Sequence, residues 1–180
     1  MVGSSSFEVV FGAGEDNQYV ITSHRAVAHP DWDQFTFAND IAILELDSTI
    51  EFGGKTKCTV LVCIETLLLS ELAQPICLPS SNDYEDQTAL LIGNLRKYSR
   101  MSFVNENDCE AYWGPSENII CTEANCDCDI ATGILVIPGP NYQQIGIAGM
   151  GSTMGCIPGL PKTYTEVYPY LDWISSVTGV

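Results

Sequence analysis

The sequence predicts an all-β fold that ends in one α-helix. Short runs of branched and aromatic residues recur along the chain, separated by glycine, proline and small polar residues that favour turns. Near the C-terminus the pattern changes, because Val167, Leu171, Ile174 and Val177 recur at helical spacing. Many short strands with a single terminal helix are typical of a β-barrel or a β-sandwich.

The strands expected in the first half begin at residue 7. Residues 7–11 have apolar side chains at alternate positions, and the turn-forming sequence Gly-Ala-Gly follows at once. Residues 19–22 form a second β-rich run. Residues 41–46 are short and apolar, as in a strand buried on both faces.

The second half continues in the same style after a proline-rich connection. The segment 51–72 begins with Gly-Gly-Lys and becomes leucine-rich, and a short helix, an added loop and a segment foreign to the fold are all compatible with it. Strands are expected at residues 88–92, 134–137 and 144–148, and the helix is expected to start near Pro169.

Composition excludes several classes of function. The 180 residues fit one domain or two small subdomains, and 46% hydrophobic residues suffice for a core. With 23 acidic and 7 basic residues, the net charge of −16 repels phosphates and argues against nucleic acid and anionic membranes. It favours basic partners or substrates, although solubility is the simpler explanation. The most apolar stretch, 59–72, contains Glu65 and is too short to span a bilayer.

Eight cysteines in 180 residues indicate disulfides and therefore an oxidising compartment. The first 11 residues contain no basic segment followed by an apolar run, so no signal peptide is visible. We expect that a signal peptide was removed or that the sequence begins inside a longer gene product.

Three stretches, in order along the chain, resemble motifs of the chymotrypsin/trypsin family of serine proteases. They cover most of the chain from about Phe7 onward, with the exception of 51–72. The matching segments are His29-Pro30 with Asn39-Asp40-Ile41-Ala42-Ile43-Leu44, then Pro75-Ile76-Cys77-Leu78-Pro79, and last Gly146-Ile147, Gly155-Cys156, Pro158-Gly159, Tyr164-Thr165-Glu166-Val167 and Tyr170-Leu171-Asp172-Trp173-Ile174.

The resemblance implies a chymotrypsin-like double antiparallel β-barrel whose N-terminal barrel is incomplete, followed by a C-terminal α-helix. Residues 1–180 are then one incomplete trypsin-like domain. Its expected parts are a partial N-terminal barrel (7–50), an atypical insert (51–72), an interdomain connection (73–87), a C-terminal barrel (88–168) and the helix (169–180).

Enzymes of this family use a serine nucleophile, a histidine base and an aspartate that orients the histidine. Asp40 matches the aspartate. The family's histidine lies in Ala-Ala-His-Cys, upstream of the strand matched by residues 7–11, and only Met1 to Ser6 precede that strand here. His24 and His29 match non-catalytic positions, so Asp40 either needs a histidine from elsewhere or is a relic satisfied by backbone groups or water.

The nucleophile is also missing from its expected place. The family pattern Cys-x-Gly-Asp-Ser-Gly-Gly-Pro aligns with residues 126–133, which puts Ile130 at the serine position. Asp129 matches the aspartate that accepts the new N-terminus on zymogen activation. Cys128 replaces the glycine at the oxyanion position. Thr132 lacks an adjacent base, so we do not expect it to act as a displaced nucleophile.

The resemblance also assigns a specificity pocket. Ala124 is the nearest match to its floor, and Met150 and Gly151 match its wall. Because this floor carries no charge, the pocket is not expected to select Lys or Arg as trypsin does.

The resemblance pairs Cys109 with Cys121, and Cys156 with either Cys126 or Cys128. Cys77 normally pairs with an upstream segment, and Cys58 and Cys63 have no family counterpart. The run 126–129 also invites a metal interpretation, but pairs of ligands at zinc-binding spacing are absent, so no metal and no cofactor are expected.

Three hypotheses follow. The first is a secreted, proteolytically inactive serine protease homologue, or a fragment of one, that binds proteins or peptides such as an active protease or its substrate. The second is an active serine-type endopeptidase whose sequence here is incomplete. The third is a disulfide-rich structural or metal-binding protein.

Overall fold

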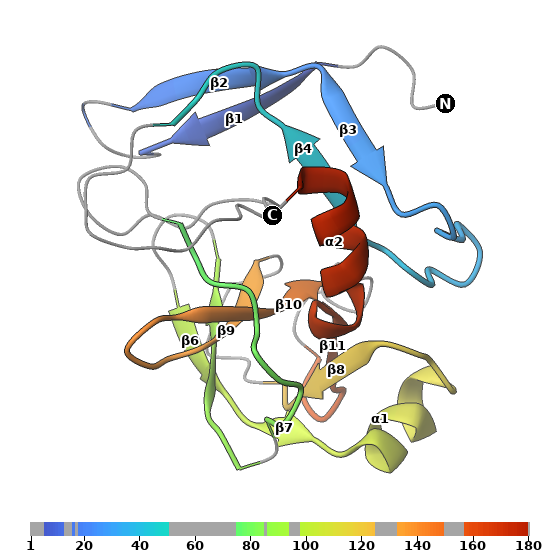
Figure 1. Ribbon diagram of the computed structural model, residues 1–180. Helices are drawn as coiled ribbons and strands as arrows, with labels where there is room; N and C mark the ends of the chain where they lie inside the picture. Colours follow the sequence, from blue (N-terminus) through green and yellow to red (C-terminus); the bar gives the residue numbers. More distant parts are fainter. Residues whose placement is uncertain are drawn as a thin grey trace.

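The computed structural model describes residues 6–12, 16, 18–50, 75–84, 86–93, 98–124, 133–149 and 157–179. In this part of the chain the structure is mostly β, as predicted, and ends in a helix (Figure 1). The elements are β1 (Phe7–Phe11), β2 (Tyr19–Ser23), β3 (Arg25–Ala28), β4 (Ala42–Glu45), β5 (Ala89–Ile92), β6 (Tyr98–Met101), β7 (Phe103–Val104), α1 (Glu106–Trp113), β8 (Ile119–Thr122), β9 (Ile134–Ile137), β10 (Gln143–Ala148), β11 (Lys162–Glu166), the 3₁₀ turn η3 (Tyr168–Tyr170) and α2 (Leu171–Thr178).

The N-terminal half consists of two antiparallel pairs of strands. Strand β1 pairs with β2. In the last residue pair of this two-stranded sheet, the rings of Phe11 and Tyr19 stack with centroids 5.0 Å apart. Strand β3 pairs with β4, with Arg25 opposite Glu45. Each pair buries little by itself, because a two-stranded sheet has only one small apolar face. These strands therefore depend on contacts with the rest of the chain.

The C-terminal half is a seven-stranded antiparallel sheet in the order β6-β5-β9-β10-β11-β8-β7. Its two edge strands, β6 and β7, are separated in sequence by Ser102 alone, so the sheet must curl until its edges nearly meet. The Ser102 carbonyl accepts a hydrogen bond from the Glu123 N–H at 2.9 Å, which extends the pairing of β7 with β8 up to the link with β6. The result is a nearly closed barrel, whose fully buried filling includes Leu91, Met101, Leu135, Ile145 and Tyr164.

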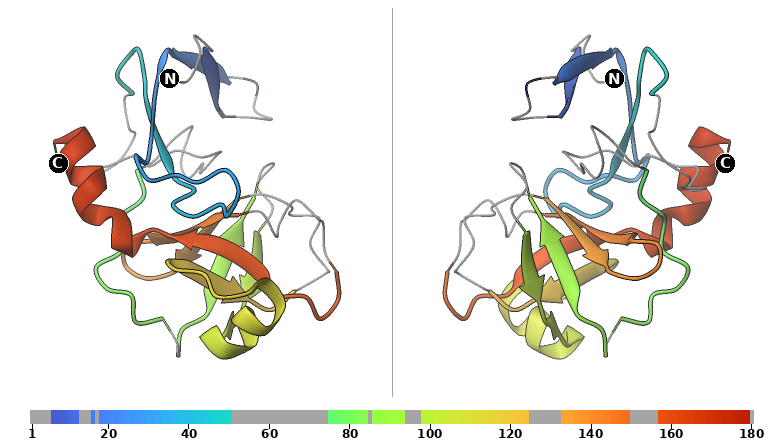
Figure 2. Two further views of the ribbon diagram at one scale, coloured as in Figure 1. Left: turned by 90° about the vertical axis from the view of Figure 1, so that its right-hand side faces the viewer. Right: turned by 90° about the vertical axis from the view of Figure 1, so that its left-hand side faces the viewer.

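Helix α2 joins the two halves. Ile174 and Val167 are buried against Ile41 and Ile43 of the β4 region and Ile147 of the barrel. Figures 1 and 2 show α2 rising from the barrel to lie beside β4. Of the four apolar residues predicted at helical spacing, Val167 and Ile174 are thus buried between the barrel and the N-terminal strands, and Val177 packs against them. No helix in the described part of the chain is long and apolar enough to cross a membrane.

The predicted fold class is confirmed, and strands occur at each of the six runs where the sequence predicted them. The predicted insert at 51–72 lies outside the described residues. Helix α1 and strands β3, β6, β7, β8 and β11 were not predicted individually.

Cys109 of α1 and Cys121 of β8 form a disulfide, the pairing implied by the family resemblance, with Cα atoms 6.0 Å apart. Cys77 is disulfide-bonded as well. Residues Cys126, Cys128 and Cys156 lie outside the described residues, so the second expected bridge stays a prediction.

We expect a Cys109→Ala, Cys121→Ala variant to lose about 2–4 kcal/mol of unfolding free energy, mainly because the unfolded chain is freed of a loop closed over 12 residues. Urea denaturation under oxidising conditions measures this loss. Each single variant breaks the same bond and serves as the control. A double variant much less stable than both singles, or as stable as the parent, would contradict the expected role of this bridge.

Candidate catalytic site

Asp40 lies in a tight turn just before β4. Its neighbour Asn39 has a positive φ of 55°, and the Ile41 N–H donates to the Asn39 carbonyl at 2.8 Å. Asparagine tolerates this left-handed backbone better than most residues. The turn ends the long loop after β3 and leaves the Asp40 side chain half-buried.

Asn39 fixes this turn to both halves of the molecule. Its side-chain amide donates to the Asp31 carbonyl at 2.9 Å, and its side-chain oxygen accepts a hydrogen bond from the Tyr170 hydroxyl at 3.1 Å. The contact with Tyr170 spans 131 residues of sequence. Asp40 is therefore held at the junction between the N-terminal loop and the C-terminal helix.

The Tyr170 hydroxyl lies in an acidic environment. Burial raises its pKa above the ordinary value, and the hydrogen bond from Asn118 opposes this rise. The charges of Glu166, Asp40 and Glu117 raise the pKa further. Tyr170 therefore stays protonated at neutral pH and donates to Asn39.

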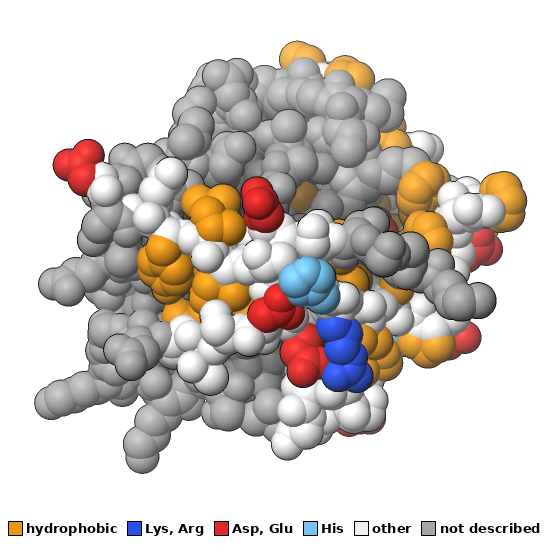
Figure 3. Space-filling model, turned by 90° about the horizontal axis from the view of Figure 1, so that it is seen from above, with side chains coloured by type: hydrophobic (Ala, Val, Ile, Leu, Met, Phe, Trp, Pro, Cys, Tyr) orange, Lys and Arg blue, Asp and Glu red, His pale blue; other side chains and the backbone are white. Residues whose placement is uncertain are grey.

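The chain has two histidines, both among the described residues. His24 pairs through Nδ1 with the Asp47 carboxylate at an exposed edge. On the face seen in Figure 3 the basic side chains lie against acidic ones, in keeping with the ion pairs His24–Asp47 and Arg25–Glu45.

His29 occupies a different setting. Its Nδ1 accepts the Asp31 N–H at 3.2 Å, and its ring packs against Tyr170 and Trp173 with centroid distances of 5.3 and 5.1 Å. The His29 ring is thus part of the surface against which the C-terminal helix packs. Within the described residues neither histidine hydrogen-bonds to Asp40, which is the contact that a catalytic base requires.

Most other residues of the predicted site are not described. Cys126, Cys128, Asp129, Ile130, Met150, Gly151 and Cys156 lie outside the described ranges, so their roles stay predictions. Ala124 is half-buried two residues after β8. Gly133, the last residue of the predicted nucleophile segment, directly precedes β9, and its backbone lies close to that of Ile92.

Comparison with known proteins identifies the family. The family model for Trypsin matches residues 1–174. This chain belongs to the trypsin family of serine proteases. Among curated trypsin-like relatives, Brachyurin of Leptuca pugilator is 27% identical over all of this chain and 80% of its own length. Chymotrypsin-2 of Vespa crabro is 26% identical over 97% of this chain and 79% of its own length.

The trypsin-like fold is supported by a solved structure as well. Kallikrein-related peptidase 10 matches with a TM-score of 0.73, covering 97% of this chain and 79% of that chain. At 20% identity this likeness establishes the fold alone. Together with the nearly closed barrel and the C-terminal helix, it confirms the chymotrypsin-like architecture expected from the sequence.

Sequence reasoning did not find the network of Asn39, Tyr170 and His29, although all three lie in the motifs that carry the resemblance. It also did not single out Glu166, whose carboxylate is half-buried and whose pKa is raised by that burial. One signal was available: a lone acidic residue in the run Tyr-Thr-Glu-Val, between two buried positions, is unusual for a β-strand.

Proposed function

We propose that this chain is a secreted, proteolytically inactive member of the trypsin family that acts by binding other proteins. The observation that carries the proposal is the placement of its two histidines. His24 is paired with Asp47 at an exposed edge, and His29 packs against Tyr170 and Trp173. Neither is left as a partner for Asp40.

The residues that match the nucleophile segment support the same proposal. Ile130 stands at the serine position and offers no nucleophilic atom. Cys128 replaces the glycine whose backbone N–H helps to bind the oxyanion in active relatives. In this proposal Asp40 and Asp129 are remnants of a mechanism that the chain no longer performs.

The binding role follows from what the chain retains. Trypsin-like proteins act on protein substrates, and the fold here has the nearly closed barrel and the C-terminal helix of the family. Its partners in this proposal are proteins or peptides, such as an active protease or a substrate of one. Secretion agrees with the disulfides and with the extracellular setting typical of the family.

An active endopeptidase is the second candidate. The chain spans about four fifths of the length of Brachyurin and Chymotrypsin-2, at 80% and 79%. The catalytic histidine of an active form would then be encoded outside the 180 residues. A full-length transcript that contains Ala-Ala-His-Cys and Asp-Ser-Gly-Gly would favour this candidate.

We expect no measurable amide hydrolysis by the purified chain. Removal of one triad member from a serine protease leaves roughly 10³–10⁴-fold catalysis over water, and here two members are absent. An Ile130→Ser variant should stay inactive, because no histidine is placed to take the proton of the serine. A panel of chromogenic peptides and a serine-directed covalent inhibitor provide the test, with trypsin as the positive control.

Stoichiometric labelling by the inhibitor, with turnover lost on labelling, would overturn the inactive assignment. Labelling at Thr132 would locate the nucleophile there and show that the active-site loop is misaligned. Zinc bound in stoichiometric amount after purification would instead favour a metal-binding protein.

A further inference from the structure

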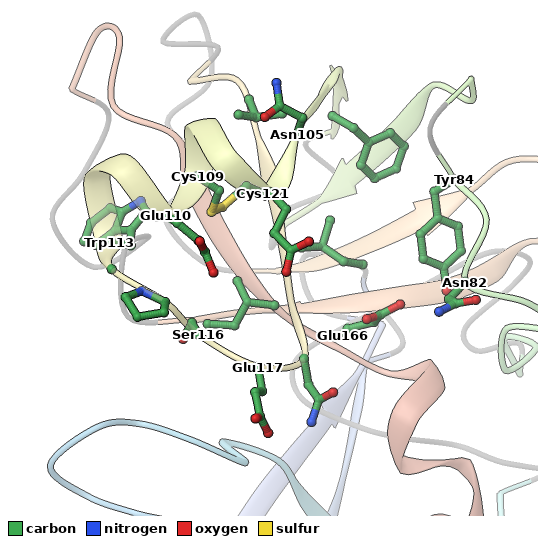
Figure 4. A pocket seen from close by; sticks show the side chains of 18 of the residues that line it. Asn82, Tyr84, Asn105, Cys109, Glu110, Trp113, Ser116, Glu117, Cys121 and Glu166 are labelled. Atoms are coloured by element: carbon green, nitrogen blue, oxygen red, sulfur yellow. A yellow bond between two sulfur atoms is a disulfide. The ribbon is translucent and has the colours of Figure 1, made fainter.

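A groove of about 1160 Å³ lies on the C-terminal barrel, and none of the described residues that line it matches a member of the catalytic triad. Its walls are α1, the segment 114–118 that follows it, strands β7 and β8, Glu166 of β11, and Asn82, Tyr84 and Asp86 of the connection before β5. The Cys109–Cys121 disulfide ties α1 to β8 beneath the groove (Figure 4). Two of its walls are therefore covalently joined.

The groove is acidic and partly aromatic. No lysine, arginine or histidine is among the described residues that line it. Figure 4 shows Glu110 reaching in from α1, with Glu166 on the other side from β11. Its carboxylates are Asp86, Glu106, Glu110, Glu117 and Glu166, and its aromatic side chains are Tyr84, Phe103 and Trp113.

Glu166 is the carboxylate that gains most from a cation. It is half-buried, and burial raises its pKa above the ordinary value. Neither of the two ion pairs among the described residues includes Glu166. A carboxylate in such a place becomes more favourable when a cation neutralises it.

Tyr84 provides an independent indication of a ligand. The residue is only 7% exposed, yet its hydroxyl has no hydrogen-bond partner. Its ring stacks on Phe103 at 6.0 Å, and Figure 4 shows its hydroxyl end next to Asn82 and close to Glu166. A buried hydroxyl without a partner costs free energy that a bound donor would recover. Gln144 also has unpartnered buried polar atoms, but it does not line the groove.

The side chains that line the groove are best suited to bind a guanidinium group. Carboxylate oxygens and the Tyr84 oxygen accept hydrogen bonds, and Arg presents five N–H donors in a planar fork that also stacks on aromatic rings. A metal ion is a poorer fit, because no group of three or more His, Cys, Asp or Glu in the described residues is arranged to hold one. The volume exceeds that of one side chain, so a polypeptide segment fits better than a single amino acid.

We propose that this groove binds an arginine-bearing segment of a basic partner protein, with one guanidinium group held between Glu166 and Tyr84. The net charge of −16 attracts such a partner over long distance. The inference goes beyond the proposed function by naming a site and a partner class. It does not depend on the loss of catalysis, because none of the described residues that line the groove matches the triad.

The test uses a fluorescein-labelled hexa-arginine peptide and the intact, oxidised chain, with binding followed by fluorescence anisotropy at about 0.15 M salt. We expect saturable 1:1 binding. Glu166→Gln should weaken it about tenfold or more, as for loss of a charged hydrogen bond, and Tyr84→Phe about three- to tenfold. Glu8→Gln, at an exposed position of β1, removes the same charge far from the groove and should change affinity less than twofold.

One further peptide and one further variant are included in the test. A hexa-lysine peptide should bind more weakly, because its ammonium groups lack the planar fork. Glu110→Gln on α1 should weaken binding too, and it replaces Glu166→Gln if that variant fails to fold. The melting temperature of each variant is measured first.

Equal loss of affinity in Glu8→Gln and Glu166→Gln, with no effect of Tyr84→Phe, would show general attraction of a polycation and overturn the proposal. Free spermine that binds with the same dependence on Glu166 and Tyr84, while the peptide does not bind, would overturn the assignment to a protein partner. The chromogenic assay reports on catalysis separately, so the two proposals fail independently.

Discussion

A Gly133→Ala variant is expected to be severely destabilised. A Cβ atom at this position would lie 2.2 Å from the carbonyl oxygen of Ile92 and 3.1 Å from the Cα of Gly93. Both are backbone atoms of a segment that is paired in the barrel, so they cannot move aside cheaply. The φ of Gly133 is 155°, a conformation that residues with side chains rarely adopt. We expect a loss of roughly 2–6 kcal/mol, the sum of about 1–3 for overpacking and about 1–3 for backbone strain.

Urea denaturation followed by tryptophan fluorescence measures this loss. Gly139→Ala is the matched control, since its added Cβ would meet only the Asn141 carbonyl oxygen at 3.5 Å, an ordinary contact. That control should stay within about 1 kcal/mol of the parent. A Gly133→Ala protein with an unchanged midpoint would mean that the start of β9 does not approach β5 as closely as described.

The second large effect is expected at Ile174. This side chain is 1% exposed and lies in the cluster that joins α2 to the N-terminal strands and the barrel. Ile174→Ala removes three carbon atoms from a packed contact, and such changes cost about 2–5 kcal/mol. Because the N-terminal strand pairs have little core of their own, we expect them to become sensitive to proteolysis before the barrel does.

Ser175→Ala, on the exposed side of the same helix, is the control and should stay within about 0.5 kcal/mol of the parent. Limited proteolysis with mass spectrometry locates the first cuts. First cuts confined to residues 89–166 would contradict the expected order, because the barrel would then be the weaker half.

Strands with branched or aromatic residues at regular spacing could be predicted from the sequence, and β11 could not. Strand β11 reads Lys-Thr-Tyr-Thr-Glu, which looks exposed, yet its first four residues are buried. Lys162, Thr163 and Thr165 are buried because β11 is an inner strand, paired with β8 on one side and β10 on the other. Tertiary contacts override local polarity here, and no pattern along the strand shows it.

Helix α1 was missed for a related reason. Its sequence Glu-Asn-Asp-Cys-Glu-Ala-Tyr-Trp has no apolar stripe, and of its residues only Cys109 is buried. The position of this helix is determined by the residues that cap its two ends instead. The Asn105 side chain accepts the Asp108 N–H at 2.9 Å, and Gly114 ends the helix with a positive φ of 80°. Asparagine three residues before an aspartate, with a glycine beyond, was a readable capping signal that periodicity does not capture.

The candidate site divides along similar lines. The Cys109–Cys121 disulfide could be predicted from the family motif, because residue identity and spacing were enough, whereas the role of Asp40 stays a prediction. The groove could not be predicted, since Tyr84, Glu110 and Glu166 come from three distant segments that only the closed barrel brings together.

The contacts of α2 with the N-terminal strands also determine the order in which parts of this chain can fold during synthesis. The barrel is contiguous from β5 to β11, so it can close as soon as those residues emerge. Asn39 and Tyr170, in contrast, are 131 residues apart, which at about 5–20 residues per second means roughly 7–26 seconds of synthesis between them. Throughout that interval Ile41 and Ile43 have no partner helix. Ile41 and Ile43 are therefore apolar residues that wait longest for their partners during synthesis, until Tyr170 and Ile174 have been made.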